Sequence, residues 1–512
     1  MRTYRPADSP GFRYLLTLFL ILFNLIVTTY VTAEELPSPL VPTENTSPTT
    51  DPPGPQPVYG PAYPARYAVI QTGAINAMFN SHAQWGSGFD PHFSLIPQFP
   101  NSSYELSSGS GVTYLLAGAL WVGGVVGGDT LVSVGADGWQ NVTETYPDGY
   151  TSTTFTGSVV PIQPIGDLAF RSDCTDSIHA GLGNLYNPFD HRTHKPLPIK
   201  IAIRAHAWNT APADHCILYD VVITNIGTQT IQDGYAGLYF DGDVGDISDG
   251  YHAADDITGF TPDGGIAYIA DNDGDLFKAR SCPGVFCAKL LADSWPAGTL
   301  SYNWWIGNAN PVNDFGPQRV TTYRDLGTGG QGTPEGDRNK YWYLRNGDID
   351  YDQVMTCLMA SDPNWTPVGQ AICQAFSKGF DTRFLYSFGP FALAPDSAVR
   401  FVFSTFSIDS LHTDPDNDKN IGLRGGTYDP FTYESKLNLD GVKQMGHVAD
   451  SLALFLLDPS TQVYGLRVVS RFADSVLLEW DDWGFGSIDG YNIYASPIPD
   501  TAFPVKGILP PW

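Results

Sequence analysis

Apolar and polar residues alternate along much of the chain between residues 67 and 458. In residues 199–207, every second position from Ile199 onwards is isoleucine or alanine, and lysine, arginine and histidine lie among the positions between them. A period of two places the apolar side chains on one face of a β-strand, whereas a helix needs a period of about 3.6. The pattern therefore predicts strands that bury one face.

Glycine-containing turns separate several of these runs. Residues 119–122 and 130–134 flank Gly127-Gly128-Asp129, which predicts a β-hairpin. Residues 216–225 and 235–241 combine β-branched and aromatic side chains, and we expect them to form a long antiparallel pair. Between them, Val-Ile-Thr-Asn-Ile-Gly at residues 222–227 resembles the N-x-G turns of immunoglobulin-like bacterial surface domains, which implies a sandwich.

Helical patterns are few, and they fall at residues 351–360, 367–377 and 440–457. In the last segment Val442, Met445 and Val448 recur at helical spacing, which predicts a closing helix packed on the sheets. The first two segments predict a small helical hairpin. No period of 20 to 50 residues indicates a solenoid or a propeller. The fold class expected is mainly β, with one or more antiparallel β-sandwich domains and a few short helices.

The N-terminus has the layout of a signal peptide. Three arginines precede an apolar run over residues 14–31, and the run closes on Val31-Thr32-Ala33. We expect residues 1–33 to be removed by cleavage after Ala33. The run is about 18 residues long, so an uncleaved membrane anchor is the alternative. In both cases the remainder is exported, and the expected location is extracellular or at the cell surface.

Composition divides the part of the chain that is expected to be exported into a linker and a β-rich region. Residues 34–64 are rich in proline, threonine and serine and predict a disordered linker. Residues 65–460 form a large β-rich extracellular region of one or two subdomains. Glycine and proline are frequent there, as expected for many short strands joined by tight turns.

The last segment, residues 461–512, carries a family resemblance. Val-Leu-Leu-Glu-Trp at residues 476–480 and Asp-Gly-Tyr-Asn-Ile-Tyr at 489–494 look like the first half of a fibronectin type III domain. The resemblance implies that Trp480 and Tyr491 lie in a sandwich core. Such a sandwich needs about seven strands, so a truncated domain, and a chain that is a fragment of a longer protein, are expected.

The larger region also resembles uncharacterised secreted bacterial proteins. The residues that carry this resemblance are 237–245 and 387–393. It implies an exported location and assigns no chemistry.

The charge balance limits the possible partners. The chain has 27 basic and 54 acidic residues, a formal net charge of -27. The negative electrostatic potential of such a chain repels nucleic acid and anionic membrane surfaces, so neither is expected as a partner. Contact with a membrane is expected only through an uncleaved N-terminal segment.

The six cysteines all lie in the middle of an exported chain, where disulfides are expected rather than a metal site. Short local closures form most easily, which leaves one remaining pair. The predicted bridges are Cys282–Cys287, Cys357–Cys373 and Cys174–Cys216.

Catalytic motifs are missing from the sequence. It has no G-x-S-x-G elbow, no H-E-x-x-H helix and no phosphate loop, and the glycine-rich residues 327–332 lack the lysine of such a loop. His191, His194 and His206 form a formal metal triad, but their spacing in a strand does not bring imidazoles to one face. We interpret them as surface or satisfied histidines.

Aspartate-rich loops are the best site candidates. Oxygen ligands close together in sequence suit calcium, although Leu276 and Lys419 occupy positions where a helix-loop-helix calcium site has glycine. Solvated turns are the alternative interpretation, and both stay open. The candidate residues are Asp241, Asp243, Asp246 and Asp249 in one loop and Asp271, Asp273 and Asp275 in the next, with Asp414, Asp416 and Asp418 in a third.

Aromatic runs at residues 302–305 and 341–343 are either core or a surface for stacking on sugars. The function expected is that of an exported structural or adhesion protein without catalysis, with a surface protein or a glycan as partner. The alternatives are a calcium-dependent or carbohydrate-binding module and a secreted hydrolase, which would need a carboxylate cleft or a preorganised nucleophile.

Overall fold

The structure is a computed structural model. It describes residues 67–86, 103–106, 110–136, 143–148, 159–177, 186–187, 192–246, 252–275, 282–291, 298–306, 314–325, 333–424, 427–457, 464–471, 476–481, 494–495 and 503–504. The predicted leader and linker, residues 1–64, lie outside the described residues. So do His191, Asp249 and the glycine-rich residues 327–332.

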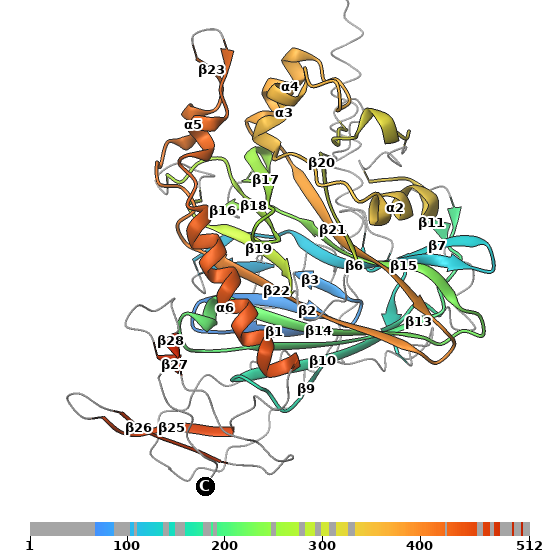
Figure 1. The fold of residues 1–512 in the computed structure, drawn as a ribbon, viewed down its shortest axis with the longest axis vertical. Coiled ribbons are helices and arrows are strands. Elements are labelled where there is room, and N and C mark those ends of the chain that lie inside the picture. The colour runs from blue at the N-terminus through green and yellow to red at the C-terminus, as the bar shows by residue number, and fades with distance from the viewer. Residues whose placement is uncertain are drawn as a thin grey trace, which may run out of the picture. The chain divides into compact units, whose positions relative to one another are not determined.

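The fold is mainly β, as predicted, and it contains two large antiparallel sheets (Figure 1). The first has eleven strands, in the order β16-β5-β4-β2-β3-β6-β15-β21-β20, with β1 on β2 and β7 on β6. Its strands are β1 (Tyr67–Gln71), β2 (Ile75–Asn80), β3 (Gln84–Gly86), β4 (Tyr104–Leu106), β5 (Val112–Thr113), β6 (Ala117–Val126), β7 (Asp129–Val134), β15 (Ile231–Asp241), β16 (Gly245–Asp246), β20 (Thr299–Ile306) and β21 (Thr382–Leu393).

The second sheet has nine strands, in the order β17-β18-β19-β22-β14-β13-β10-β8, with β9 on β10. Its strands are β8 (Tyr146–Pro147), β9 (Val160–Pro161), β10 (Leu168–Thr175), β13 (Ile199–Ala207), β14 (Cys216–Asn225), β17 (Asp256–Thr261), β18 (Ile266–Asp271), β19 (Val285–Leu290) and β22 (Ala398–Ile408). Four short two-stranded pairs complete the described strands: β11 (Tyr186–Asn187) with β12 (Arg192–Thr193), β23 (Leu423–Arg424) with β24 (Thr427–Tyr428), β25 (Tyr464–Arg471) with β26 (Val476–Asp481), and β27 (Tyr494–Ala495) with β28 (Phe503–Pro504).

The two sheets share one hydrophobic core. Trp85 of the first sheet packs edge-on against Phe403 of the second, with ring centroids 5.1 Å apart. Phe388 and Phe401 make a similar contact at 4.7 Å. Rings from both sheets interdigitate in this way, so the pair forms a sandwich.

Helices cover the outer faces of the sandwich (Figure 1). Helix α6 (Leu439–Leu457) packs on β22 and β14 of the second sheet, and helix α2 (Gly336–Arg345) packs on β7 and β21 of the first. Strand β18 is buried at every position, because alternate side chains belong to the core between the sheets and to the core beneath α6. The remaining described helices are α3 (Thr356–Met359), α4 (Gln370–Ser377) and α5 (Phe431–Glu434), with 3-10 turns η2 (Ala213–His215), η3 (His252–Asp255), η6 (Val320–Thr322), η7 (Gln353–Met355) and η8 (Asn417–Asn420).

Two local predictions are confirmed. Strands β6 and β7 form the expected hairpin, and Gly127 and Gly128 of its two-residue turn have φ values of 60° and 95°. A tight hairpin turn of this kind needs positive φ at both positions, which glycine adopts without strain. The predicted closing helix is α6, whose Val442 and Ala449 are buried against the second sheet.

The predicted pairing of residues 216–225 with 235–241 is wrong. Strand β14 pairs with β13 and β22, whereas β15 pairs with β6 and β21 in the other sheet. The connection between β14 and β15 crosses from one sheet to the other, and so does the connection between β21 and β22. Asn225 joins the two crossings, because its Nδ2 donates to the carbonyl of Leu393 at 2.9 Å.

One of the three predicted disulfides is present. Cys357 and Cys373 are bonded and join α3 to α4, as expected. Cys174, Cys216, Cys282 and Cys287 are free thiols, and all are buried.

The two other predicted bridges are wrong, and the sheet explains why. Cys174 lies opposite Ile201 and Ile201 opposite Ile223, whereas Cys216 is seven residues further along β14. At about 3.3 Å per residue the thiols are separated by far more than a disulfide spans. Cys282 belongs to the core between the sheets and Cys287 to the core beneath α6, so they lie on opposite faces of the second sheet.

The C-terminal resemblance falls on two antiparallel pairs, β25–β26 and β27–β28. Trp480 lies on β26, and Tyr491 lies outside the described residues. Among the described helices, none is both long enough and apolar enough to cross a membrane.

Candidate metal centre

Asp241 is the last residue of β15, and the sheet places it opposite Arg383 of β21. The Arg383 Nε donates to Asp241 Oδ1 at 3.0 Å, and the two side chains are 2% and 0% exposed. Arg383 also binds Asp381, whose Oδ1 is 2.7 Å from a terminal guanidinium nitrogen. One buried guanidinium therefore holds two carboxylates at this end of the first sheet.

A third carboxylate, that of Asp243, completes a cluster. Asp241, Asp243 and Asp381 each offer an oxygen, and these oxygens lie within 4.8 Å of one another. Calcium binds oxygen ligands at about 2.3–2.6 Å, so two oxygens of one shell lie at most about 5 Å apart. The three carboxylates can therefore hold a metal ion together, and their donor set of hard oxygens fits such an ion.

The side chain of Asp381 is 34% exposed, which opens the cluster to solvent on one side. Asp243 is half-buried as well, whereas Asp241 forms the buried floor. An ion therefore has a path into the cluster and a rigid strand end beneath it.

The electrostatics of the cluster favour a cation. Burial raises the pKa of Asp241 to about 6, because desolvation outweighs the attraction of Arg383. Burial and the charges of Asp241 and Asp381 raise the pKa of Asp243 well above its ordinary value. Burial by itself lowers the pKa of Arg383, but Asp241 and Asp381 raise it well above its ordinary value. Three carboxyl groups thus share one guanidinium, and a cation bound among them would stabilise their ionised forms.

The structure brings only part of the first predicted loop into the cluster. Asp241 and Asp243 belong to it, whereas Asp246 lies exposed on β16. The sequence analysis missed Asp381 and Arg383, which lie about 140 residues further along the chain. Their signal is faint: an acidic and a basic residue two positions apart at the start of a strand, Asp381-Thr-Arg383.

The second and third predicted loops contact each other. In the second, the Asp273 and Asp275 amides donate to the carboxylates of Asp271 and Asp273 at 3.0 and 3.2 Å. Gly274 of this loop donates its amide to the carbonyl of Pro415 in the third loop at 3.0 Å. The turns therefore have the local geometry expected of aspartate-rich turns, and the fold also places them side by side.

Of the three histidines considered as a metal triad, the structure describes His194 and His206, and they have different surroundings. His194 lies fully buried between Glu144 and Asp176, with ring nitrogens 3.1 and 2.7 Å from carboxylate oxygens. His206 lies on β13, where burial lowers its pKa to about 4. The interpretation of satisfied histidines fits His194, whose two ring nitrogens both have carboxylate partners.

Five of the six aromatic side chains in the two runs are core, and the sixth, Trp342, is half-buried against it. Tyr302, Trp304 and Trp305 are at most 2% exposed, and Trp305 stacks with Tyr239 at 5.8 Å beneath α2. Tyr341 and Tyr343 of α2 are buried too. These five rings offer no open face to a sugar.

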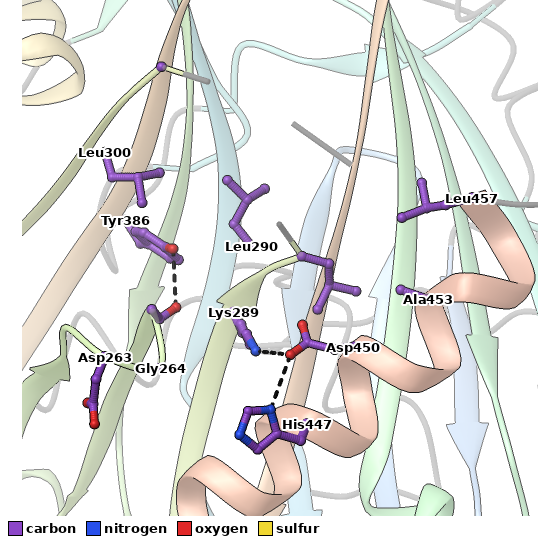
Figure 2. A pocket seen from close by; sticks show the side chains of 13 residues that line it. Asp263, Gly264, Lys289, Leu290, Leu300, Tyr386, His447, Asp450, Ala453 and Leu457 are labelled. Carbon is purple, nitrogen blue, oxygen red and sulfur yellow. Dashed lines mark hydrogen bonds and ion pairs between the residues drawn. The ribbon is translucent and has the colours of Figure 1, made fainter. Parts of the chain in front are cut away.

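A pocket of about 570 Å³ lies beside α6 (Figure 2). Leucines from β19 and β20 and Ala453 of α6 line much of it. Lys289 donates to Asp450 of α6 and to the carbonyl of Gly446, the latter at 3.3 Å. Lys289 and Asp450 therefore neutralise each other. The wall of the pocket is largely apolar, and its lysine is already paired within the protein.

No protein-family model matches the chain, and no curated protein matches it either.

Proposed function

We propose that this chain is an exported structural or adhesion protein whose β-sandwich is stabilised by a calcium ion at Asp241, Asp243 and Asp381. The observation that carries the proposal is the convergence of these three carboxylate oxygens within 4.8 Å of one another. The export signal and the fibronectin-like segment supply the rest of the expectation.

Calcium fits the cluster better than magnesium does. Calcium tolerates irregular shells of six to eight oxygens, whereas magnesium requires a near-ideal octahedron at about 2.0–2.1 Å and retains its waters. Arg383 already holds two of the three carboxylates from one side, which restricts the arrangement that they can offer an ion, and calcium tolerates such a restriction better than magnesium.

The location of the cluster suits a structural role. Asp241 ends the central strand β15, and Asp381 precedes its neighbour β21. An ion bound there ties the start of β21 to the turn that follows β15. Outside the cell calcium is abundant, and extracellular modules bind it with dissociation constants of about 10⁻⁴–10⁻³ M. The ion would therefore be bound after export and would stabilise the folded state.

The test is a thermal melt of the full chain with excess chelator, and then with millimolar calcium or magnesium. Millimolar calcium is about one to ten times such a dissociation constant, so calcium that binds only the folded state should raise stability by about 0.4–1.4 kcal/mol. Magnesium should raise it less.

Asp381→Asn should remove most of the calcium effect. Asp396→Asn is the matched control, because Asp396 lies exposed beyond the other end of the same strand β21. An unchanged melting midpoint of the parent chain in calcium would contradict the proposal.

A further inference from the structure

Strands β17 and β18 place two carboxylates directly opposite each other. Asp256 is the first residue of β17, Asp271 is the last residue of β18, and their Cα atoms are partners in the antiparallel register. The two residues are 0% and 1% exposed. Opposite residues of an antiparallel pair lie on one face with Cβ atoms about 5 Å apart, and like charges there repel.

Each carboxylate keeps one oxygen without a partner. Asp256 Oδ2 accepts the Val244 amide at 3.1 Å, and Asp271 Oδ1 accepts the Asp273 amide at 3.0 Å. Within the described part of the chain, Asp256 Oδ1 and Asp271 Oδ2 are buried and accept no hydrogen bond. Buried polar atoms almost always have a partner, and a missing ion is one of the standard reasons when they do not.

The surroundings of this pair are negative. Burial, and then the charges of Asp271 and Asp243, raise the pKa of Asp256 well above its ordinary value. Burial and then the charge of Asp255 do the same for Asp271. The strongest charges acting on either carboxylate are thus those of other carboxylates.

The pair adjoins the cluster at the end of β15. The Val244 amide that binds Asp256 follows directly after Asp243, and the amide of Phe380, next to Asp381, donates to the Asp256 carbonyl at 2.9 Å. Gly379 permits this approach: its φ is 110°, and a Cβ there would lie 2.1 Å from the carbonyl oxygen of Asp255. Asp256 therefore lies between the first cluster and the loop that begins at Asp271.

We infer that Asp256 and Asp271 bind a second divalent cation, with calcium as the chemistry that fits, next to the site formed by Asp241, Asp243 and Asp381. The inference extends the proposed calcium centre and rests on it. The second ion joins the start of β17, where Asp256 holds the Val244 amide of the loop after β15, to the end of β18. Its ligands are buried, whereas Asp381 of the first site is 34% exposed, so the second ion exchanges more slowly.

The experiment measures bound calcium per chain. Equilibrium dialysis of the full exported chain against saturating calcium gives the number of bound ions, and release into excess chelator is then followed with time. We expect two ions per chain, released in a fast and a slow phase. Asp256→Asn and Asp271→Asn should each retain one ion and lose the slow phase. Asp263→Asn, at the exposed tip of the same hairpin, should retain both.

Each alternative outcome is distinct. One ion in the parent chain, released in one phase and unchanged in Asp256→Asn, would overturn the second site and leave the first. No bound ion would overturn both. If either variant fails to fold, the ion count and the two release phases of the parent chain still decide the question.

Discussion

Asp241 and Arg383 face each other across β15 and β21, joined by a 3.0 Å ion pair in which both side chains are almost fully buried. A buried pair of this kind adds little stability compared with well-packed apolar residues, but removing one partner leaves the other as an uncompensated buried charge. The pair therefore makes the end of the first sheet sensitive to any change in local charge.

Arg383→Met should lower the free energy of unfolding by about 3–5 kcal/mol in chelator, because Asp241 loses its only strong cationic partner among the described residues. Calcium should restore part of this loss, since three carboxylates then face the ion without a competing guanidinium. Urea denaturation with and without calcium measures both effects.

Arg400→Met is the control for this substitution. Arg400 pairs with Asp220 but its side chain is 44% exposed, so its loss should cost at most about 1 kcal/mol and should not depend on calcium. Equal stability of Arg383→Met and the parent chain in chelator would contradict the importance of the pair.

The stability of the folded state should fall as the pH rises above neutrality, because His194 loses its proton. Burial opposes the charge on this imidazole, but the hydrogen bonds to Asp176 and Glu144 outweigh it and raise the pKa from 6.5 to about 10. Because the pKa in the folded state is the higher one, the stabilisation is complete below about pH 6.5 and is lost as the pH rises through about 10. Denaturation midpoints measured between pH 6 and 10 should decline.

His194→Gln should flatten this decline and lower stability at pH 6 by about 3–5 kcal/mol, because two buried carboxylates lose their cation. His206→Gln serves as the contrast. Burial lowers the pKa of His206 to about 4, so its substitution should alter the acid side of the profile and leave the alkaline side unchanged. A parent profile that is level up to pH 10 would show that His194 is not charged in the folded state.

The cysteines should divide into one bridge and four inert thiols. Native protein should not react with a thiol reagent, because the four free cysteines are buried and burial raises the pKa of each thiol, that of Cys282 to about 12. Denaturation without a reductant should release four reactive groups, and six only after reduction.

Replacing both Cys357 and Cys373 by serine should cost about 3 kcal/mol, since the bridge closes a loop with a sequence separation of 16. Cys174→Ala leaves the bridge intact and serves as the control. Peptide mapping that finds Cys282 joined to Cys287 would contradict the arrangement of the second sheet.

The parts of the fold that sequence predicts well are those set by near neighbours. The β6–β7 hairpin follows from its two glycines, and α6 follows from the spacing of Val442 and Met445. The β14–β15 pairing failed because a short connection between two strand-like segments is compatible with a hairpin or with a crossing between sheets. Nothing in residues 226–230 distinguishes the two.

The candidate site likewise contains residues that the local sequence identifies and residues that only the three-dimensional structure brings to it. Asp241 and Asp243 stand out because they are two residues apart, and the local pattern identifies them. Asp381 and Arg383 reach them only through the register of β15 with β21. Asp256 is one of many acidic residues in the sequence, and only its position opposite Asp271 gives it significance.

The crossing of β14 to β15 and of β21 to β22 has a consequence for the order in which the chain folds. Strand β14 lies between β13, which precedes it closely, and β22, which is about 180 residues further along. β15 depends in the same way on β21. As the chain is synthesised from its N-terminus, β15 lacks its second neighbour until residue 393 has been added, and β14 lacks its second neighbour until residue 408 has been added. The two sheets therefore close together late in synthesis, and contacts of such long range make that closure slow.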